Sequence, residues 1–216
     1  MPKFDNFKLE HFPNNVSIYQ SDNLYKFTQD AIMLAKFCNI KHSDDVLELC
    51  AGSGVISLYA YSNCTFSHLY FNEIQKDLCE IIEENIKFNN LKRRSKIFNC
   101  NLKDLKSSDF PRNPDVIICN PPYQKVNEKS KINEKREIAI ARHEIEATLE
   151  DIIKKASELI KDKGRFYIVH LASRSVELIT LCSKYNMEIK RLKFVFNGDK
   201  EAYLVLAEAV KNARPG

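Results

Sequence analysis

The chain has 216 residues, of which 44% are hydrophobic and 29% are charged, and its formal net charge is +4. This length and composition suit one globular domain with a sizeable core, and a second full domain would be crowded. No apolar run is long enough to span a membrane, and residues 1–6 lack the charged-then-apolar order of a signal peptide. We therefore expect a soluble, cytoplasmic protein, and its modest charge does not by itself identify a nucleic-acid binder.

The seven cysteines are an odd number and include no C-x-x-C pair or other metal-ligand spacing. We therefore expect free, mostly buried thiols in a reducing compartment, and no metal site.

Residues 1–42 are expected to form an N-terminal extension, in which Thr28 or Asp30 caps a helix through residues 32–37. This extension is expected to pack over the open end of a ligand crevice. Residues 43–216 are expected to form the single globular unit.

Strands and helices alternate along that unit. The predicted strands are residues 45–49, 68–71, 96–98, 116–119, 165–171, 188–196 and 202–208. The predicted helices are residues 55–61, residues 75–89, a short one after residue 104, and one that begins at Thr148–Asp151 and continues to residue 160. Alternation of this kind is typical of a mostly parallel sheet, and a tight turn at residues 197–199 adds one antiparallel strand. The expected fold class is α/β, with a Rossmann-like seven-stranded sheet.

The turn after the first strand of this unit reads Glu48-x-Cys50-x-Gly52-x-Gly54. Its glycines let the backbone pass close to a ligand at a helix N-terminus, which is typical of a nucleotide-like cofactor. The spacing differs from the dinucleotide fingerprint G-x-G-x-x-G, and an acidic residue at the strand's end suits a cationic cofactor better than a pyrophosphate. Glu73 ends the next strand, where a carboxylate can accept bonds from both ribose hydroxyls. Alone it is equally consistent with a solvated surface glutamate, and the glycine turn about twenty residues earlier favours the cofactor role.

The tetrapeptide Asn120-Pro121-Pro122-Tyr123 directly follows the apolar run at residues 116–119. It is therefore expected at the carboxyl end of a strand, where open α/β sheets bind ligands. Its amide, its proline carbonyls and its aromatic ring predict a clamp for a planar amine, and an ordinary turn is the alternative. The side-chain carbonyl of Asn120 and the backbone carbonyl of Pro121 can accept both amino hydrogens and draw the nitrogen toward tetrahedral geometry. Tyr123 is expected to stack on a flipped base.

Three segments together resemble the successive motifs of S-adenosylmethionine-dependent amino-group methyltransferases. They are residues 46–54, Asn72-Glu73-Ile74 and Asn120-Pro121-Pro122-Tyr123. Within that group the chain most resembles the bacterial tRNA(Val) adenine-37 N6-methyltransferases, and the resemblance extends to residues 26–31 and 141–144. It implies a class I methyltransferase fold, S-adenosylmethionine as cofactor, and N6-methylation of an adenosine in the anticodon stem-loop of a tRNA.

The same resemblance implies that Asn120, Pro121, Pro122 and Tyr123 form the catalytic clamp. The cofactor-binding residues that it implies are Phe27, Asp30, Glu48, Cys50, Ala51, Gly52, Gly54, Glu73, Ile74, Asn101, Leu102 and Asn120. No general base is assigned, because the methylated amine can lose its proton after transfer.

The chain departs from the family at three of these positions. Glu48 stands where the family usually has Asp, and Cys50 stands where it often has Gly, so Cys50 is not expected to need a positive φ. Asn101 replaces an acidic residue that often meets the adenine amino group, and its carbonyl can still accept that bond. His170 lies within an apolar strand and is expected to be a structural histidine.

Two basic clusters are candidates for RNA binding. Their members are Lys125, Lys129, Lys131, Lys135, Arg136 and Arg142 directly after the clamp, and Lys92, Arg93 and Arg94 before the third strand of the unit. A flexible basic loop beside a base pocket suits a phosphate backbone. For the second cluster, solvated surface charge is an equally good explanation.

Other functions stay open at this point. Methylation of glutamine in release factors uses the same tetrapeptide, because a carboxamide is also a planar amine, but those enzymes typically place a helical domain before the cofactor turn. DNA adenine methylation is less favoured for want of a target-recognition region. A non-catalytic RNA-binding module with the same fold is a different class, against which the intact glycine turn, Glu73 and the clamp argue. We expect tRNA as the partner of a monomer.

Overall fold

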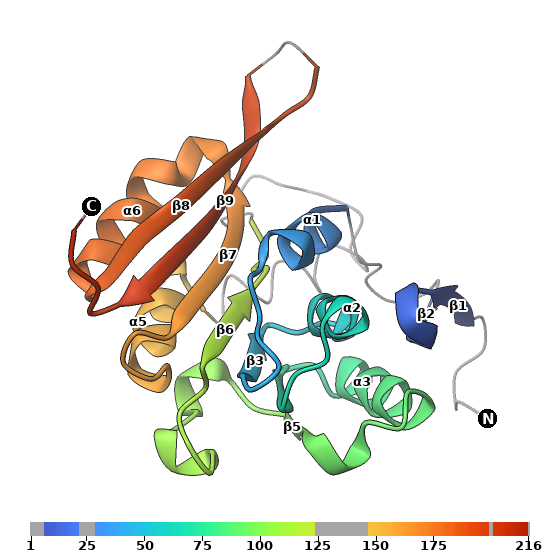
Figure 1. Ribbon diagram of the computed structural model, residues 1–216. Helices are drawn as coiled ribbons and strands as arrows, with labels where there is room; N and C mark the ends of the chain where they lie inside the picture. Colours follow the sequence, from blue (N-terminus) through green and yellow to red (C-terminus); the bar gives the residue numbers. More distant parts are fainter. Residues whose placement is uncertain (1–6, 22–28, 124–146, 199–200, 216) are drawn as a thin grey trace, which may run out of the picture.

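The computed structural model describes residues 7–21, 29–123, 147–198 and 201–215 (Figure 1). A seven-stranded sheet with the order β5-β4-β3-β6-β7-β9-β8 forms its centre. Its strands are β3 (Asp45–Leu49), β4 (His68–Asn72), β5 (Ser95–Phe98), β6 (Val116–Cys119), β7 (Arg165–Leu171), β8 (Met187–Phe196) and β9 (Ala202–Lys211). The helices are α1 (Gln29–Phe37), α2 (Val55–Asn63), α3 (Lys76–Phe88), α5 (Leu149–Leu159) and α6 (Ser175–Lys184). None of the helices in these parts of the chain has both the length and the apolar character needed to cross a membrane.

Strand β9 is the only antiparallel member of the sheet, since it runs against both β7 and β8. All other pairings in the sheet are parallel. The expected α/β class, with seven strands of which one is antiparallel, is therefore confirmed. The buried, continuously apolar strands β3 and β6 begin and end at the predicted residues, as expected for strands covered on both faces.

Helices cover both faces of the sheet, and each face has its own hydrophobic core (Figure 1). One core lies between the sheet and α1, α2 and α3, and the other between the sheet and α5 and α6. Successive residues of a strand point to opposite faces, so Val46 enters the first core whereas Leu47 and Leu49 enter the second. The start of α5 is confirmed by a capping box, in which Oγ1 of Thr148 accepts from the backbone of Asp151.

Two elements were not predicted from the sequence. Helix α6 follows β7 and packs beside β8. A separate hairpin of β1 (Phe7–His11) and β2 (Ser17–Ser21) precedes α1 and packs on α3, where the Oδ1 atoms of Asn85 and Asn89 accept backbone bonds from β2. The short helix expected after residue 104 is instead a pair of 3-10 turns, η3 (Leu102–Asp104) and η4 (Ser107–Asp109).

Helix α1 is confirmed by the structure. Asp30 lies inside this helix and not at its N-cap, so the capping role suggested for Asp30 is wrong. Thr28, the other suggested cap, lies outside the described residues. Helix α1 contacts α2 and β7, which brings part of the extension near the carboxyl ends of the strands.

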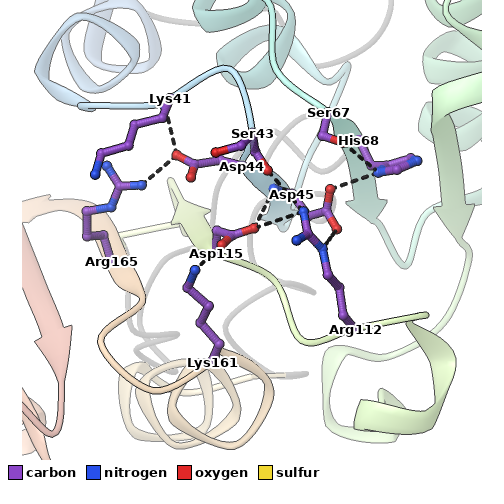
Figure 2. A network of polar contacts seen from close by, with 10 residues as sticks. All are labelled: Lys41, Ser43, Asp44, Asp45, Ser67, His68, Arg112, Asp115, Lys161 and Arg165. Atoms are coloured by element: carbon purple, nitrogen blue, oxygen red, sulfur yellow. Dashed lines mark hydrogen bonds and ion pairs between the residues drawn. The ribbon is translucent and has the colours of Figure 1, made fainter.

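Buried acids and surface bases connect the strands at their amino ends (Figure 2). Asp45 receives bonds from Arg112 Nε at 2.6 Å and His68 Nδ1 at 2.8 Å, and its own backbone N–H donates to Asp115. Asp44 pairs with Arg165. Burial alone would raise the pKa of Asp45, but the bonds from Arg112 and His68 outweigh this effect and hold its pKa below the ordinary value. This network links the amino ends of the strands, at the edge of the sheet opposite to the candidate site described below.

All seven cysteines are free thiols. Cys79, Cys119 and Cys182 are buried and the other four are partly exposed.

Candidate active site

The candidate site lies at the carboxyl ends of β3, β4 and β6. Leu49, the last residue of β3, is in register with Asn72 of β4 and with Cys119 of β6. The turn after β3 therefore lies between Glu73 and Asn120, which directly follow the neighbouring strands. Strand order reverses at β3, and such a switch point is where open α/β sheets bind ligands.

The glycine turn is built from left-handed backbone. Cys50, Gly52 and Gly54 have φ values of +53°, +57° and +77°. The expectation that Cys50 avoids a positive φ is therefore wrong, and Cys50 holds a conformation that costs an L-residue about 1–2 kcal/mol. The chain must reverse direction within these few residues to start α2 at Val55, with Gly54 at its N-cap, and this need overrides the preference of the side chain.

The two glycines meet different surroundings. A Cβ atom on Gly54 would lie 3.0 Å from Cε1 of Phe71, whereas one on Gly52 would meet no atom within 4 Å. Gly54 is therefore needed for packing between α2 and the sheet. Gly52 instead leaves open space beside its backbone.

Glu73 is buried, with 1% of its surface exposed, and so is not a solvated surface glutamate. Its Oε2 accepts from the backbone N–H of Gly52, and its Oε1 accepts from that of Gln75, both at 2.9 Å. These two backbone bonds fix the position of the carboxylate beside the turn. Glu73 thus joins the glycine turn to the end of β4.

Glu48 lies beneath the same turn and is completely buried. Its Oε2 accepts from the backbone N–H of Ser57 at 2.8 Å, while its Oε1 has no partner among the described residues. Burial raises the pKa of Glu48 to about 7, and bonds from Ser57 offset only part of this shift. A buried carboxylate with an unused oxygen is stabilised by a nearby positive charge.

A recess opens beside Glu73, with about 270 Å³ of empty space that includes open solvent. It is lined by Cys50, Asn72, Glu73, Ile74, Cys100, Asn101, Leu102 and Ala147. Five of these were predicted as cofactor contacts, and Asn72, Cys100 and Ala147 were not. The Nδ2 group of Asn72 donates to the carbonyl of Cys100 at 2.9 Å, which fixes this wall of the recess.

Asn101 already uses its side-chain carbonyl within the protein. Its Oδ1 accepts from the backbone N–H of Lys103 at 3.0 Å and so caps η3. The same side chain lines the recess.

The Asn120–Tyr123 clamp follows β6, and its side chains interact with α1 and β7. The Tyr123 hydroxyl lies 2.8 Å from Oδ1 of Asn120 and 3.1 Å from Oδ2 of Asp30. A hydroxyl has one proton, so it donates to one of these two acceptors at a time. The Tyr123 ring packs edge-on against the ring of His170, with centroids 5.5 Å apart.

His170 is buried at the end of β7. Burial, assisted by the nearby charge of Arg174, lowers the pKa of His170 to about 4. The imidazole is therefore neutral near pH 7, and its Nδ1 accepts from the backbone N–H of Leu171 at 2.8 Å. The neutral ring of His170 thus packs against the Tyr123 ring without adding charge.

The second basic cluster does not join this site. Lys92, Arg93 and Arg94 form the 3-10 turn η2, which directly precedes β5 and so lies at the amino edge of the sheet. Arg94 donates to the carbonyl of Phe66 at 3.3 Å. Several predicted residues lie outside the described part of the chain: Phe27, Lys125, Lys129, Lys131, Lys135, Arg136 and Arg142.

Comparison with known proteins agrees with this geometry. The family model described as methyltransferase small domain matches residues 14–196. A tRNA1(Val) (adenine(37)-N6)-methyltransferase of Aliivibrio salmonicida is 25% identical over 172 residues, which cover 80% of this chain and 71% of that relative. One of the same name from Dyadobacter fermentans is 24% identical, covering 95% of this chain and 82% of the relative.

Solved structures share the fold. Methanocaldococcus jannaschii Trm5 in complex with adenosine has a TM-score of 0.67 at 15% identity, over 98% of this chain. The present chain spans only 57% of the length of that protein. A predicted O-methyltransferase from Agrobacterium tumefaciens has a TM-score of 0.65 at 16% identity, over 86% of this chain and 82% of its own. The fold is that of class I methyltransferases, and the chain belongs to the methyltransferase small domain family.

Proposed function

We propose that this chain transfers a methyl group from S-adenosylmethionine to N6 of an adenine in tRNA, at position 37 of a valine tRNA. The observation that carries the proposal is the placement of the Asn120–Tyr123 clamp and the Glu73 recess on the two strands that flank the glycine turn. The names of the two sequence relatives support the substrate.

The residues around the turn fit this cofactor. The carboxylate of Glu73 is fixed by two backbone bonds and would hold the ribose hydroxyls of the cofactor. The unused oxygen of buried Glu48 favours a positive charge near the turn. Gly52 leaves the space that a ligand needs to approach the backbone. When bound, S-adenosylmethionine supplies a sulfonium methyl group for transfer to an amine nitrogen.

The clamp prepares the amine of the substrate. An exocyclic adenine amine is a poor nucleophile, because its lone pair is delocalised into the ring. Oδ1 of Asn120 and the backbone carbonyl of Pro121 accept its two hydrogens, which localises the lone pair, and Pro122 restricts the backbone beyond them. The Tyr123 ring stacks on the flipped base, a contact worth about 1–3 kcal/mol. The chain contributes mainly positioning.

Entry of the base requires a change at Tyr123. Its hydroxyl donates to Oδ1 of Asn120, which is the acceptor that the substrate amine needs. Oδ2 of Asp30 lies 3.1 Å from the same hydroxyl and provides the alternative acceptor. Asp30 therefore frees Asn120 for the substrate and acts as a positioning residue.

We propose in addition that residues 43–216 act as one domain, with residues 1–42 beside the crevice, and that the enzyme is a cytoplasmic monomer. The free thiols suit a reducing compartment. The basic residues between Lys125 and Arg142 follow the clamp directly in the sequence and are proposed to contact the tRNA backbone.

The test uses purified protein with methyl-labelled cofactor and, separately, tRNA, rRNA, DNA and a release factor. Label is expected in tRNA alone, and Asn120→Ala is expected to lower the transfer rate at least about 100-fold, by analogy with the removal of one oxyanion-hole donor. The affinity for the cofactor should change little, because the recess lies on the other side of the glycine turn. Label in the release factor would support the glutamine alternative, and tRNA binding without transfer to any substrate would support a binding module.

A further inference from the structure

The β8–β9 hairpin extends beyond the rest of the sheet (Figure 1). Leu204 of β9 faces Leu171, the last residue of β7, so the residues of the hairpin before Leu204 have no partner on β7. Strand β8 runs parallel to β6, and its end at Phe196 therefore points to the same edge of the sheet as Asn120. Two strands lie between β6 and β8, which places the hairpin about 14 Å to the side of the clamp.

The end of this hairpin carries exposed aromatic side chains, of which Phe196 and Tyr203 lie in the projecting part and Phe194 lies level with His170 of β7. The exposed fractions are 41% for Phe194, 58% for Phe196 and 41% for Tyr203. Phe194 faces Val205 across the hairpin and Phe196 faces Ala202, with a register shift beside Tyr203. Among the large exposed hydrophobic residues in the described ranges, only Phe88 lies away from this hairpin and the adjoining α6.

Basic residues alternate with these apolar ones along β8. Arg191 is held against the body of the protein, where it pairs with Glu208 and lies 4.3 Å from the centre of the Phe37 ring. Lys193 is exposed and lies on the face of the hairpin opposite to Phe194. Aromatic faces for bases combined with cations for phosphates are the features that bind unpaired nucleotides on strand surfaces.

We propose that the β8–β9 hairpin is an RNA-binding surface, on which Phe194, Phe196 and Tyr203 stack unpaired bases of the substrate while Lys193 contacts its phosphates. This inference rests on the proposed function for the identity of the RNA. The clamp holds one flipped base, and the hairpin holds nucleotides to its side. A chain of this size thereby gains a second contact that orients the tRNA.

A second copy of the chain is the other candidate occupant, since β8 is an edge strand of the sheet. Two-fold pairing of β8 with itself would bring two copies of its basic stretch, Lys190, Arg191 and Lys193, together at one strand edge. Like charges across a strand pair are destabilising, and lysine on an edge strand is a common protection against such pairing. The charge of β8 therefore favours RNA.

The test compares the full-length chain with a variant in which Phe194, Phe196 and Tyr203 are all changed to alanine. Binding of unmodified tRNA is measured by fluorescence anisotropy without cofactor, and KM and kcat are measured with it. Binding should weaken and KM for tRNA should rise by about tenfold or more. The kcat at saturating tRNA and the Kd of the cofactor should stay within about twofold. Phe88→Ala, an exposed aromatic on α3, is the matched control and should bind tRNA as the wild type does.

Leucine variants separate stacking from simple apolar contact. Phe194→Leu and Phe196→Leu keep apolar surface but lose the planar ring, so each should also weaken tRNA binding. Full affinity in these variants would overturn the proposal, as would unchanged binding by the triple variant. Should the triple variant fail to fold, the two single variants decide the question.

Two further measurements distinguish the alternatives. Sedimentation of wild type and the triple variant reports self-association, and a wild-type dimer that the substitutions dissociate without loss of tRNA affinity would assign the surface to a second copy instead. If unmodified valine tRNA binds through the hairpin but wild type does not methylate it, the hairpin proposal stands and the proposed function is refuted. If all hairpin variants methylate the tRNA normally with unchanged KM, the proposed function stands and the hairpin proposal is refuted.

Discussion

The Tyr123 hydroxyl donates to Oδ1 of Asn120 across 2.8 Å, and Oδ2 of Asp30 lies 3.1 Å from the same hydroxyl. Asp30 belongs to α1 and is 93 residues away in sequence. If Asn120 accepts from the substrate amine, Asp30 offers the Tyr123 proton an acceptor within hydrogen-bond distance. This relationship gives α1 a direct part in the preparation of the clamp.

The Asp30–Tyr123 relationship is testable with a double-mutant cycle. Asp30→Ala removes the second acceptor, so the hydroxyl stays on Asn120 and kcat/KM for tRNA should fall about two- to tenfold, the worth of one hydrogen bond. Adding Tyr123→Phe removes the competing donor but keeps the stacking ring, so the double variant should recover part of that loss. Equal kcat/KM for Asp30→Ala and the double variant would show that the hydroxyl does not compete for Asn120. Cofactor affinity, measured in parallel, controls for an effect of Asp30 on that site.

A second prediction concerns Glu48 and pH. Its pKa of about 7 lies above the ordinary glutamate value of about 4.3, so ionised Glu48 opposes folding of the ligand-free protein. Neutral Glu48 therefore stabilises the fold relative to ionised Glu48. This stabilisation is complete below about pH 4.3 and is lost as the pH rises through 7. A cationic cofactor prefers the ionised form, so its affinity should rise as pH increases toward 7 and then level off. Titration calorimetry from pH 5.5 to 8.5 measures this rise, which Glu48→Gln should abolish; the same slope in both proteins would contradict the role of Glu48.

The two glycines of the turn should respond differently to substitution by alanine. Both have positive φ, which costs alanine about 1–2 kcal/mol. Gly54→Ala also crowds Phe71 and should lose about 1–3 kcal/mol more in the free energy of unfolding. Gly52→Ala meets no protein atom, and its methyl group should instead lower cofactor affinity by about tenfold or more. Urea unfolding and cofactor binding distinguish these effects, and normal cofactor affinity in Gly52→Ala would mean that the cofactor does not approach there.

The network at the amino edge of the sheet predicts a pH-dependent loss of stability (Figure 2). Asp45 has a lowered pKa, so its contribution to stability is present above its unfolded value of about 3.9 and is lost as pH falls below it. Arg112→Ala leaves this buried carboxylate short of one partner and should cost about 1–3 kcal/mol at pH 7. The difference from wild type should shrink below about pH 4. Arg93→Ala, which removes an exposed cation elsewhere, is the control and should leave stability nearly unchanged.

The sequence predicted the parallel part of the sheet well because its strands are continuous apolar runs that end at turn residues. Helix α6 was missed because it buries only Leu178 and Cys182, while Val176 and Thr180 are β-branched residues that disfavour a helix. The β1–β2 hairpin was missed because it is held by the side-chain amides of Asn85 and Asn89 on a distant helix, a contact without a local signal.

The candidate site, like the fold, was predicted from the sequence only in part. Of the residues that line the recess, Glu73 was predicted from its place at a strand's end, and Ile74 and Asn101 were predicted from the resemblance to the family's motifs. Ala147 lies just before α5 and reaches the recess only through tertiary packing. The positive φ of Cys50 was missed because cysteine does not favour this conformation, although the glycine that the family often has at this position indicated it.

The central claim is N6-methylation of adenine 37, and one measurement tests it most directly. Unmodified valine tRNA transcript is incubated with purified protein and S-adenosylmethionine, digested, and mapped by mass spectrometry. The proposed function predicts N6-methyladenosine at position 37 with wild type, and its loss with Asn120→Ala while most of the cofactor affinity is kept. Methylation at another position or on another atom, or transfer that is unaffected by Asn120→Ala, would contradict the account.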